Sequence, residues 1–524
     1  SSHASSSLSW ADGISRAFMQ TGRADRHVVA VVGDGALTGG MTWEALNNIS
    51  DDNERNLVII VNDNGRSYAP TIGGMARYLN RARTAPSYRA MYRTSGRAFG
   101  RFGAAGRAMY RGLRGGTHGF LSRLTNNVAL YSNLDIKYLG PVDGHDLEAM
   151  IETLKLAKSY GAPVIVHAIT EKGRGYQPAL DDLEDQFHAV GKINPDTGVA
   201  MSNSTALSWT DIFADELVRV GERRNDVIAI TAAMLRPTGL ARFAERFPDR
   251  VYDVGIAEQH AVTAAAGMAF GGLHPVVAMY ATFMNRAFDQ VLMDVGLHGA
   301  GVTFVLDRAG VTGPDGPSHH GIWDLAMLQI VPRIRIGVPR DAARLVELLD
   351  EAVDVGDAPT VVRFPKGEVG ADISAIERFE DGVEVLSRGG APDVLILPIG
   401  PMASMALEVA ERLRAEGIGV TVVDPRWAIP VQPSVVRLAA EHRIVITIED
   451  GIRVGGVGTR VRQVLRDAGV DTAVDELGVP DEFIQHATRE QILIDAGLTV
   501  DKITEDIIEQ VRGTRIPIAR PASA

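Results

Sequence analysis

The sequence predicts an α/β protein of three domains with mainly parallel sheets. Short apolar runs of strand length alternate with segments of helical pattern through most of the 524 residues. These runs are continuous stretches of Val and Ile, which is typical of strands in parallel sheets that helices cover on both faces. With 45% hydrophobic residues the chain can bury several cores, and at roughly 150 residues per domain it divides into about three domains.

The expected strands follow one another along the chain, separated by segments of helix length. One passage, 261–284, carries no formal charge and is long enough to suggest a membrane span. The Gly and Pro residues at 271–275 interrupt it, so we expect a buried helix at 261–270, a turn and a strand at 276–280. The apolar runs that predict strands lie at 27–35, 56–64, 162–170, 226–231, 274–280, 302–308, 393–400, 419–425 and 443–450.

Polar stretches that contain Gly and Pro interrupt this alternation near 191–206 and 365–382. They predict domains at 1–195, 205–370 and 385–524. Inside the first domain, residues 81–114 hold nine Arg and no acidic residue. This segment is either a solvated surface excursion or a basic lid over an anionic substrate.

The composition excludes several classes of function. A net charge of -12 argues against a general nucleic-acid binder, because affinity for the phosphate backbone comes from clustered Lys and Arg. The chain has no Cys, so it has neither a disulfide framework nor a thiol nucleophile, and any metal must be held by oxygen or imidazole ligands. We therefore expect a cytoplasmic protein that binds neither nucleic acid nor membrane, with no signal-peptide pattern at its start.

Polar side chains directly follow the first two expected strands. Asp34 comes after the first strand, between Gly33 and Gly35, and Asn64 ends the second. Because ligands in open α/β sheets bind at the carboxyl ends of strands, both side chains could reach one crevice. Carboxylate and carboxamide oxygens suit Mg²⁺, and the glycines would let backbone N–H groups approach a diphosphate. Taken alone, an Asp beside Gly is equally consistent with an ordinary turn.

The wider sequence resembles a known family over almost its whole length. A Gly-Asp-Gly motif followed by an Asn-rich strand end is similar to the signature of thiamine diphosphate enzymes. In particular it resembles the 1-deoxy-D-xylulose-5-phosphate synthase family. The motifs that carry this resemblance are GDGALTGGMTWEALNN (33–48), YLGPVDGHD (138–146), EKGRGYQPA (171–179), DVGIAEQHAVT (253–263), YATFMNRAFDQ (280–290), DRAGVTGPDGPSHHG (307–321), RFPKG (363–367) and DPRW (424–427).

The resemblance implies a transketolase-like, thiamine diphosphate-binding fold with thiamine diphosphate and Mg²⁺ as cofactors. The first domain would supply the diphosphate and metal site, the second the pyrimidine site and most substrate contacts, and the third would stabilise a homodimer. The cofactor would be held between the first and second domains of one chain. The implied metal ligands are Asp34, Asn64 and the backbone carbonyl of Arg66, and the implied cofactor contacts are His3, Ala4, Ser5, Asp34, Gly35, Ala36, Asn64, Tyr176, Glu258 and Phe283.

The resemblance also gives roles to residues that have plainer explanations. Glu258 would hydrogen-bond the aminopyrimidine ring, although an acid at a helix start is favoured by the helix dipole alone. Phe283 would stack on that ring, although an aromatic in an apolar passage is ordinarily core. A lone His in a loop, such as His319, is usually an ordinary loop residue. The implied catalytic residues are Glu258, His319, Asp315, His3, Arg308, Arg286, Tyr280 and Lys366, and His188 is a further candidate for proton transfer.

Six of these positions have more specific expectations. Asp315 and His319 would face the reacting carbon, while Tyr280, Arg286 and Arg308 would surround the acceptor aldehyde and its phosphate. Lys366 stands where the family commonly has Arg. Because Lys offers charge without the bidentate fork of Arg, the phosphate clamp could be looser or differently aimed.

The implied reaction joins pyruvate and D-glyceraldehyde 3-phosphate with loss of CO2 to give 1-deoxy-D-xylulose 5-phosphate. That product feeds isoprenoid (terpenoid) precursors and thiamine biosynthesis. Two alternatives stay open at this stage. One is a transketolase, which shares the metal-diphosphate unit and the Glu on pyrimidine. The other is a catalytically silent homologue that binds a partner.

The second alternative arises from what precedes the matched motifs in the family. Its members normally carry a further N-terminal segment with HLGPNLG-like and GHQ-like stretches, and this sequence contains neither. Loss of that segment would expose apolar surface in the first domain. Three explanations for the missing segment stay open: the sequence is truncated, the segment belongs to a separate chain, or the protein is a degenerate relative.

Overall fold

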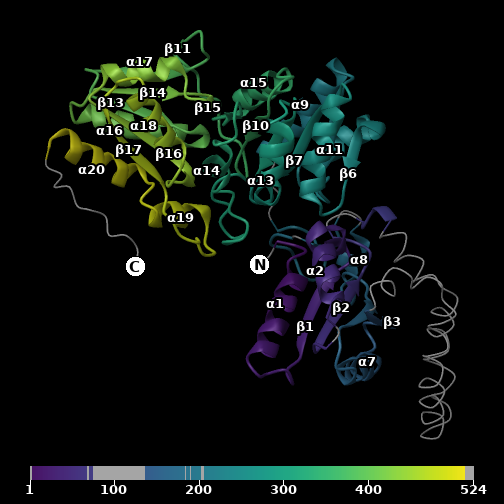
Figure 1. Ribbon diagram of the computed structural model, residues 1–524. Coiled ribbons are helices and arrows are strands. Elements are labelled where there is room, and N and C mark those ends of the chain that lie inside the picture. The colour runs from purple at the N-terminus through teal and green to yellow at the C-terminus, as the bar shows by residue number, and fades with distance from the viewer. Residues whose placement is uncertain are drawn as a thin grey trace, which may run out of the picture. The chain divides into compact units, whose positions relative to one another are not determined.

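A computed structural model describes residues 3–52, 54–67, 70–74, 136–182, 185–188, 190–201 and 206–513 (Figure 1). The Arg-rich segment 81–114 lies outside these residues. The chain forms two compact units. One comprises Ser1–Ser204 with Asp253–Ala257, and the other comprises Thr205–Tyr252 with Glu258–Ala524.

The first unit is a parallel sheet with helices on both faces. Its strands lie in the order β1-β2-β4-β3, and all pairs are parallel. Helices α1 and α2 pack on one face through Leu8, Leu46 and Ile49, and α7 packs on the other, where Val164 and Val166 are buried. The elements are α1 Ser7–Gln20, β1 Val28–Gly33, η1 Gly35–Thr38, α2 Gly40–Ser50, β2 Leu57–Asp63, β3 Lys137–Asp143, α7 Leu147–Ser159, β4 Val164–Ile169 and α8 Gln177–Asp181.

Strand β1 departs from the expected pattern of continuous burial. It lies at an edge of the sheet as described, and its residues alternate between buried and exposed. Val29 and Val31 are the exposed positions, both more than half accessible. An apolar sequence run therefore marks the strand correctly without showing that only one of its faces is covered.

The second unit contains two sheets, and the first of them has seven strands in the order β15-β9-β10-β8-β7-β5-β6. Its core is formed by helices α9, α10 and α15 against the strands, with Phe213, Leu217, Phe243 and Leu348 fully buried. The elements are α9 Trp209–Arg223, β5 Val227–Thr231, α10 Leu240–Arg246, η4 Pro248–Arg250, β6 Val251–Asp253, α11 Glu258–Phe270, β7 His274–Tyr280, α12 Ala281–Met284, η5 Asn285–Ala287, α13 Phe288–Gln290, the π-helix η6 Val291–Gly296, β8 Thr303–Asp307, α14 Asp324–Leu328, β9 Arg335–Gly337, α15 Ala342–Val353 and β10 Thr360–Arg363.

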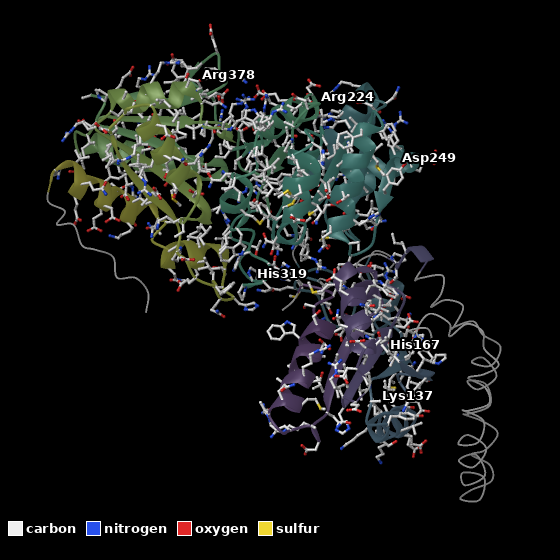
Figure 2. The ribbon with its side chains drawn as sticks, in the orientation of Figure 1. Lys137, His167, Arg224, Asp249, His319 and Arg378 are labelled. Atoms are coloured by element: carbon white, nitrogen blue, oxygen red, sulfur yellow. The ribbon has the colours of Figure 1, made fainter. Side chains whose placement is uncertain are left out.

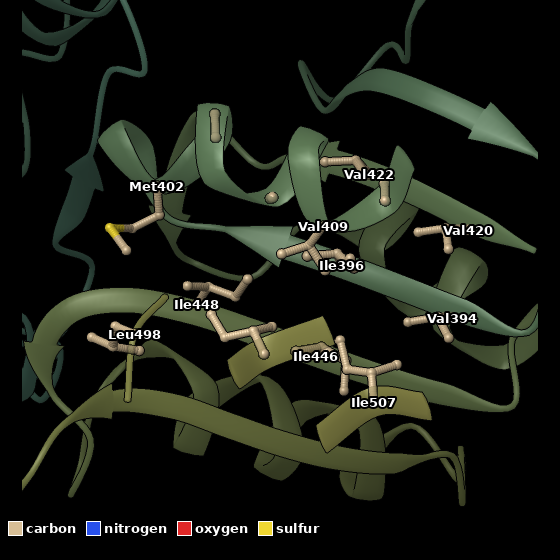
Figure 3. Packing of buried hydrophobic residues seen from close by; sticks show 14 of the residues in the cluster. Val394, Ile396, Met402, Val409, Val420, Val422, Ile446, Ile448, Leu498 and Ile507 are labelled. Atoms are coloured by element: carbon tan, nitrogen blue, oxygen red, sulfur yellow. The ribbon is translucent and has the colours of Figure 1, made fainter. Parts of the chain in front are cut away.

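The other sheet has six strands in the order β11-β12-β14-β13-β16-β17. Figure 3 shows its core, where Ile396 of β13 and Ile446 of β16 pack with Val409 of α16 and Ile507 of α20. The elements are β11 Glu377–Arg378, β12 Glu384–Gly389, β13 Val394–Pro398, η7 Gly400–Met402, α16 Ala403–Ala415, β14 Val420–Asp424, β15 Trp427–Ile429, α17 Pro433–Glu441, β16 Ile444–Ile452, α18 Val457–Asp467, β17 Ala473–Val479, α19 Arg489–Asp495 and α20 Val500–Val511.

The α/β class with mainly parallel sheets is confirmed, with three local exceptions. Strands β11, β12 and β15 pair antiparallel to a neighbour. β15 comes late in the chain and nevertheless joins the seven-stranded sheet beside β9. The expected helix at 261–270 is longer, because α11 already begins at Glu258.

None of the helices in the described part of the chain has the length and apolar character needed to cross a membrane. The uncharged passage at 261–284 is divided among α11, β7 and α12.

Candidate active site

In the first unit, Asp34 and Asn64 lie at neighbouring strand ends. β1 and β2 are parallel partners, with Gly33 opposite Asn62. Asp34 follows β1 and Asn64 follows β2, and the Asn64 backbone N–H donates to Asp34 Oδ1 at 3.4 Å. The two side chains therefore reach the same edge of the sheet, as parallel pairing requires.

Neighbouring polar groups hold both side chains in place. The Thr71 hydroxyl donates to Asp34 Oδ2, and the Arg66 backbone N–H donates to Asn64 Oδ1 at 3.1 Å. Asp34 is only 1% exposed, so its carboxylate is costly to bury unless it is partnered or binds a cation.

The oxygens gathered here are of the kind that Mg²⁺ accepts. Asp34 supplies a carboxylate, Asn64 a carboxamide and Arg66 a backbone carbonyl, all hard ligands. Within the described residues, no group of three or more His, Cys, Asp or Glu side chains could hold a metal. A metal at this sheet edge would thus depend on the mixed set, and the donor chemistry of that set fits Mg²⁺.

The segment around Ser5 packs against the turn that follows Asp34. The Ser5 hydroxyl donates to the Ala36 carbonyl at 2.8 Å, and the Thr42 hydroxyl donates to the same oxygen at 2.9 Å. Ser5 is buried with a positive φ of 70°. A Cβ on Gly35 would lie 3.1 Å from Ser67 Cβ, so a side chain at position 35 would crowd this packing. The structure thus brings the predicted residues near the chain start to those after β1.

Lys172 belongs to this group of residues, although the sequence analysis did not single it out. Its Nζ donates to the Ser67 carbonyl at 2.7 Å and lies 2.8 Å from His188 Nδ1. Burial lowers the pKa of Lys172, and burial followed by the charge of Lys172 lowers the pKa of His188. The EKGRGY motif, which was used only for Tyr176, contains this Lys and could have identified it.

Tyr176 itself follows Lys172 by one short turn and contacts Phe187, with ring centroids 6.0 Å apart. Its buried hydroxyl has no hydrogen-bond partner among the described residues. A buried Tyr hydroxyl usually finds a partner. This atom is therefore suited to contact a bound molecule.

In the second unit, Glu258 is the first residue of α11 and is 3% exposed. Its Oε2 lies 3.0 Å from Arg286 Nε, but the contact lacks hydrogen-bond geometry and Oε2 is otherwise unsatisfied within the described residues. Burial raises the pKa of Glu258, and the Arg286 charge opposes that rise. Glu258 therefore lies both at the start of a helix and in a buried pair with Arg286.

Aromatic rings line the next part of the same region. Tyr280 ends β7 and Phe283 lies in α12, with their rings nearly parallel and 5.9 Å apart. The His319 imidazole meets the Phe283 ring edge-on at 5.7 Å. The Thr282 hydroxyl donates to the Ser318 carbonyl at 3.0 Å and ties the loop of His319, which is labelled in Figure 2, to α12. Phe283 therefore contacts two other predicted site residues rather than the core alone.

Two cations share the carboxylate of Asp315. Lys366 Nζ donates to Asp315 Oδ1 at 2.8 Å, and Arg308 Nη1 lies 3.3 Å from Oδ2. The Arg308 guanidinium also stands 4.1 Å from the centre of the Tyr280 ring. Two positive charges against one acid leave net positive charge, as a phosphate site needs.

Arg308 adopts a positive φ of 58°, a conformation that side-chain-bearing residues rarely take outside functional sites. Asp307, directly before it, was not predicted as a site residue. It is fully buried, accepts a hydrogen bond from the Thr210 hydroxyl at 2.7 Å, and burial raises its pKa to about 6. Its sequence signals were its place at the end of the strand run at 302–308 and at the start of the motif 307–321.

The predicted residues thus form two sets. One set, in the first unit, contains Asp34, Asn64, Arg66, Ser5, Ala36 and Tyr176. The other, in the second unit, contains the Glu258–Arg286 pair and a separate series of contacts that joins Tyr280, Phe283, His319, Arg308, Asp315 and Lys366.

Comparison with known protein families identifies three matching segments. Residues 1–170 match "1-deoxy-D-xylulose-5-phosphate synthase", residues 205–371 match "Transketolase, pyrimidine binding domain", and residues 382–503 match "Transketolase, C-terminal domain". The second set falls within the segment 205–371, and the first set falls within the segment 1–170 except for Tyr176, which follows it.

Curated relatives match the chain over nearly its full length. A 1-deoxy-D-xylulose-5-phosphate synthase from Leifsonia xyli subsp. xyli is 72% identical over 521 residues, which cover 99% of this chain and 80% of the relative. The synthase from Clavibacter sepedonicus is 70% identical with the same coverage. A protein from Streptomyces coelicolor, 1-deoxy-D-xylulose-5-phosphate synthase 2, is 56% identical and covers 98% of this chain and 79% of its own length.

Solved structures show the same fold. The inactive beta4 tetramer of a split-gene transketolase matches with a TM-score of 0.52 and 29% identity, and covers 59% of this chain and 100% of its own. A transketolase from Campylobacter jejuni subsp. jejuni matches with a TM-score of 0.52 and 16% identity, and covers 97% of this chain and 82% of its own. The expected transketolase-like fold is therefore confirmed.

Proposed function

The chain belongs to the 1-deoxy-D-xylulose-5-phosphate synthase family, and from this we propose that it condenses pyruvate, with loss of CO2, and D-glyceraldehyde 3-phosphate. The product would be 1-deoxy-D-xylulose 5-phosphate, a precursor for isoprenoids and for thiamine. The observation that carries the proposal is the set of residues in the second unit: a buried acid paired with Arg286, and stacked aromatic rings in contact with a His and a cationic cluster.

The proposed cofactors are thiamine diphosphate and Mg²⁺. Asp34, Asn64 and the Arg66 carbonyl would hold the metal, and the metal with Lys172 would neutralise the diphosphate. Ser5, Gly35, Ala36 and Tyr176 would contact the cofactor beside them, with His3 and Ala4 in the same segment. When bound, thiamine diphosphate supplies the electron sink for breaking the bond between the pyruvate carboxylate and its carbonyl carbon.

Glu258 would bind the aminopyrimidine ring of the cofactor. Its raised pKa favours a carboxyl group that can donate a hydrogen bond, here from Oε2 to a ring nitrogen of the aminopyrimidine. The Arg286 charge opposes that rise of the pKa. Phe283 would stack on the pyrimidine.

The cationic cluster would bind the phosphorylated acceptor. Arg308 and Lys366 supply the charge, and Asp315 keeps both side chains in one place before the phosphate arrives. Tyr280, beneath the Arg308 guanidinium, fixes the direction of that fork. His319 would transfer a proton at its imidazole to or from the reacting oxygen, a role for which His is best suited at neutral pH.

We propose further that the protein is a homodimer. Exposed apolar side chains lie at and after the end of α11 and along and directly after η6 of the second unit, namely Phe270, Leu273, Met293 and Leu297, and the Phe270 ring contacts His298, which follows η6. Phe270 and Leu297 are 63% and 70% exposed, which is unusual for large apolar side chains placed together. Light scattering of the wild type and of Leu297→Glu tests this, because a dimer that uses these side chains would dissociate in the variant. A cytoplasmic location, expected from the composition, stays a prediction.

Donor specificity tests the proposed reaction against transketolase. The wild-type protein is supplied with thiamine diphosphate, Mg²⁺ and glyceraldehyde 3-phosphate, and either pyruvate or a ketose phosphate as donor. We expect product and equimolar CO2 only with pyruvate. Turnover of the ketose phosphate without CO2 would assign transketolase activity instead, and no turnover with either donor would support the silent homologue.

A further inference from the structure

The loop that carries Asp315 and His319 joins β8 to α14 in the second unit. It closes on itself through reciprocal backbone hydrogen bonds, from Gly310 N–H to the Gly321 carbonyl at 2.7 Å and from Gly321 N–H to the Gly310 carbonyl at 2.9 Å. Besides the ties to α12, Arg308, Lys366 and the end of β10, several contacts that hold this loop come from the C-terminal part of the chain. The sequence analysis had given that part no role beyond dimer stabilisation.

Arg489, the first residue of α19, bridges the loop and strand β16. Its Nη1 donates to the Val311 carbonyl at 2.6 Å, and its Nη2 donates to Asp450 Oδ2 at 2.7 Å. Asp450 is 2% exposed, so both hydrogen bonds operate away from bulk water. A guanidinium can make two such bonds at fixed directions, whereas an ammonium group cannot.

Two glycines of the loop are shaped to these C-terminal side chains. A Cβ on Gly310 would lie 2.1 Å from Asp450 Oδ2, and one on Gly316 would lie 2.2 Å from His486 Nε2. Both have positive φ, 74° and 77°. The loop backbone therefore packs directly against the side chains of Asp450 and His486, with no room for a Cβ at either glycine. Gly316 is the neighbour of Asp315, so this contact lies one residue from a predicted catalytic group.

Asp450 also faces the strand that leads to Lys366. Its Oδ1 lies 3.7 Å from Nη1 of the buried Arg363, which ends β10. Arg363 Nε donates to Asp324 Oδ2 at 2.7 Å, at the start of α14. Asp450 therefore contacts both Arg489, which holds the loop, and Arg363, which ends the strand that leads to Lys366.

We propose that Arg489, with Asp450 and His486, positions the Asp315–His319 loop for catalysis. These are positioning residues, since they act through the loop and contact no substrate. The proposal rests on the proposed function for the roles of Asp315 and His319. It gives the C-terminal part of the chain a direct part in the reaction, because a shift of the loop by about 1 Å can lower the rate on the order of 100-fold.

The test compares Arg489→Met with Arg443→Met in the full protein. Arg443 lies in the same C-terminal part, is largely exposed, and pairs with Asp393 at 3.3 Å. We expect Arg489→Met to lower kcat roughly 10- to 100-fold with little change in affinity for thiamine diphosphate, and Arg443→Met to behave as wild type. Arg489→Lys should recover part of the loss, because Lys can donate to one of the two acceptors.

A double-mutant cycle separates positioning from general stability. If Arg489 acts through Asp315, Arg489→Met should cost little further activity in an Asp315→Ala background. Additive losses in the cycle, or a wild-type kcat in Arg489→Met, would overturn the proposal. If Arg489→Met fails to fold, His486→Ala takes its place in the same cycle.

Hydrogen exchange gives a readout that does not depend on turnover. Amides of residues 309–321 should exchange several-fold faster in Arg489→Met than in Arg443→Met, while those of β13 should not change. Unchanged exchange in the loop would contradict the proposal. A wild-type protein without synthase activity but with this exchange pattern would contradict the proposed function and leave the positioning itself supported.

Discussion

The ion pair between Arg286 and Glu258 provides the sharpest energetic prediction. Arg286→Met removes the charge that lies 3.0 Å from a carboxylate that is 3% exposed. At an effective dielectric constant of roughly 20, attraction at that distance is worth about 5 kcal/mol before desolvation of the two groups is subtracted. Removing one partner of a buried pair typically costs about 3 kcal/mol, and we expect that loss here, or roughly 6 °C in the melting temperature of the second unit.

The loss should depend on pH in a direction that the structure determines. Burial already raises the pKa of Glu258 above its usual 4.5, and the pKa will rise further without Arg286. A group whose folded pKa is raised keeps its stabilising contribution below its unfolded pKa and loses it as the pH rises through the folded pKa. The melting temperatures of wild type and Arg286→Met should therefore diverge at high pH and converge as the pH falls toward 4.5.

The assay is thermal unfolding of four proteins at pH 5 and pH 8: wild type, Arg286→Met, Glu258→Gln and the double variant. The double variant should be more stable at pH 8 than Arg286→Met, with a coupling of about 2 kcal/mol. Arg246→Met is the control, because Arg246 and Glu222 form an exposed pair at 3.3 Å that should contribute less than about 1 kcal/mol. Additive single losses, or an effect equal to that of the control, would refute the reasoning.

The remaining predictions concern the charges around each set of residues. Asp307→Asn should gain stability relative to wild type as the pH rises from 4 through 6, by about 2–3 kcal/mol measured by denaturation. The reason is that burial raises the pKa of Asp307 to about 6, so ionisation of this carboxyl is costly in the folded state. A pH-independent difference would show that the folded state does not disfavour ionisation of Asp307. Lys366→Met should raise the KM for glyceraldehyde 3-phosphate about 10-fold with less effect on the KM for pyruvate. Lys366→Arg should leave the KM for glyceraldehyde 3-phosphate unchanged or lower it. Equal changes for both substrates would argue against a phosphate clamp. Asp34→Ala should abolish Mg²⁺-dependent binding of thiamine diphosphate by calorimetry, whereas Thr71→Val should weaken it only several-fold; unchanged binding in Asp34→Ala would remove Asp34 from the metal site.

Local sequence patterns predicted strands such as β7 and β8 for a physical reason, but they did not predict β3, β10 or β17. Runs such as 274–280 and 302–308 are apolar throughout because both faces of β7 and β8 are buried, so continuous hydrophobicity and burial coincide. Asp34 and Asn64 were predicted to share a sheet edge because parallel neighbours end at the same side, and that requires no knowledge of distant parts of the chain.

Other features depend on pairings that no local pattern contains. Trp427–Ile429 joins the seven-stranded sheet from a distant part of the chain, and its three residues are too few to show a period. The ion pair of Glu258 with Arg286 joins two helical segments on either side of β7. The packing of Gly310 against Asp450 spans more than a hundred residues of sequence. In each case the sequence supplied the residues, and only the fold showed their partners.

The most direct test of the proposed reaction is product formation by the wild-type protein and by Glu258→Gln. Pyruvate labelled at its carboxyl carbon, glyceraldehyde 3-phosphate, thiamine diphosphate and Mg²⁺ are supplied, and labelled CO2 and 1-deoxy-D-xylulose 5-phosphate are both quantified. We predict equal amounts of the two from the wild type and a loss on the order of 100-fold or more in the variant. Equal rates in wild type and Glu258→Gln, or CO2 without the sugar phosphate, would contradict the account.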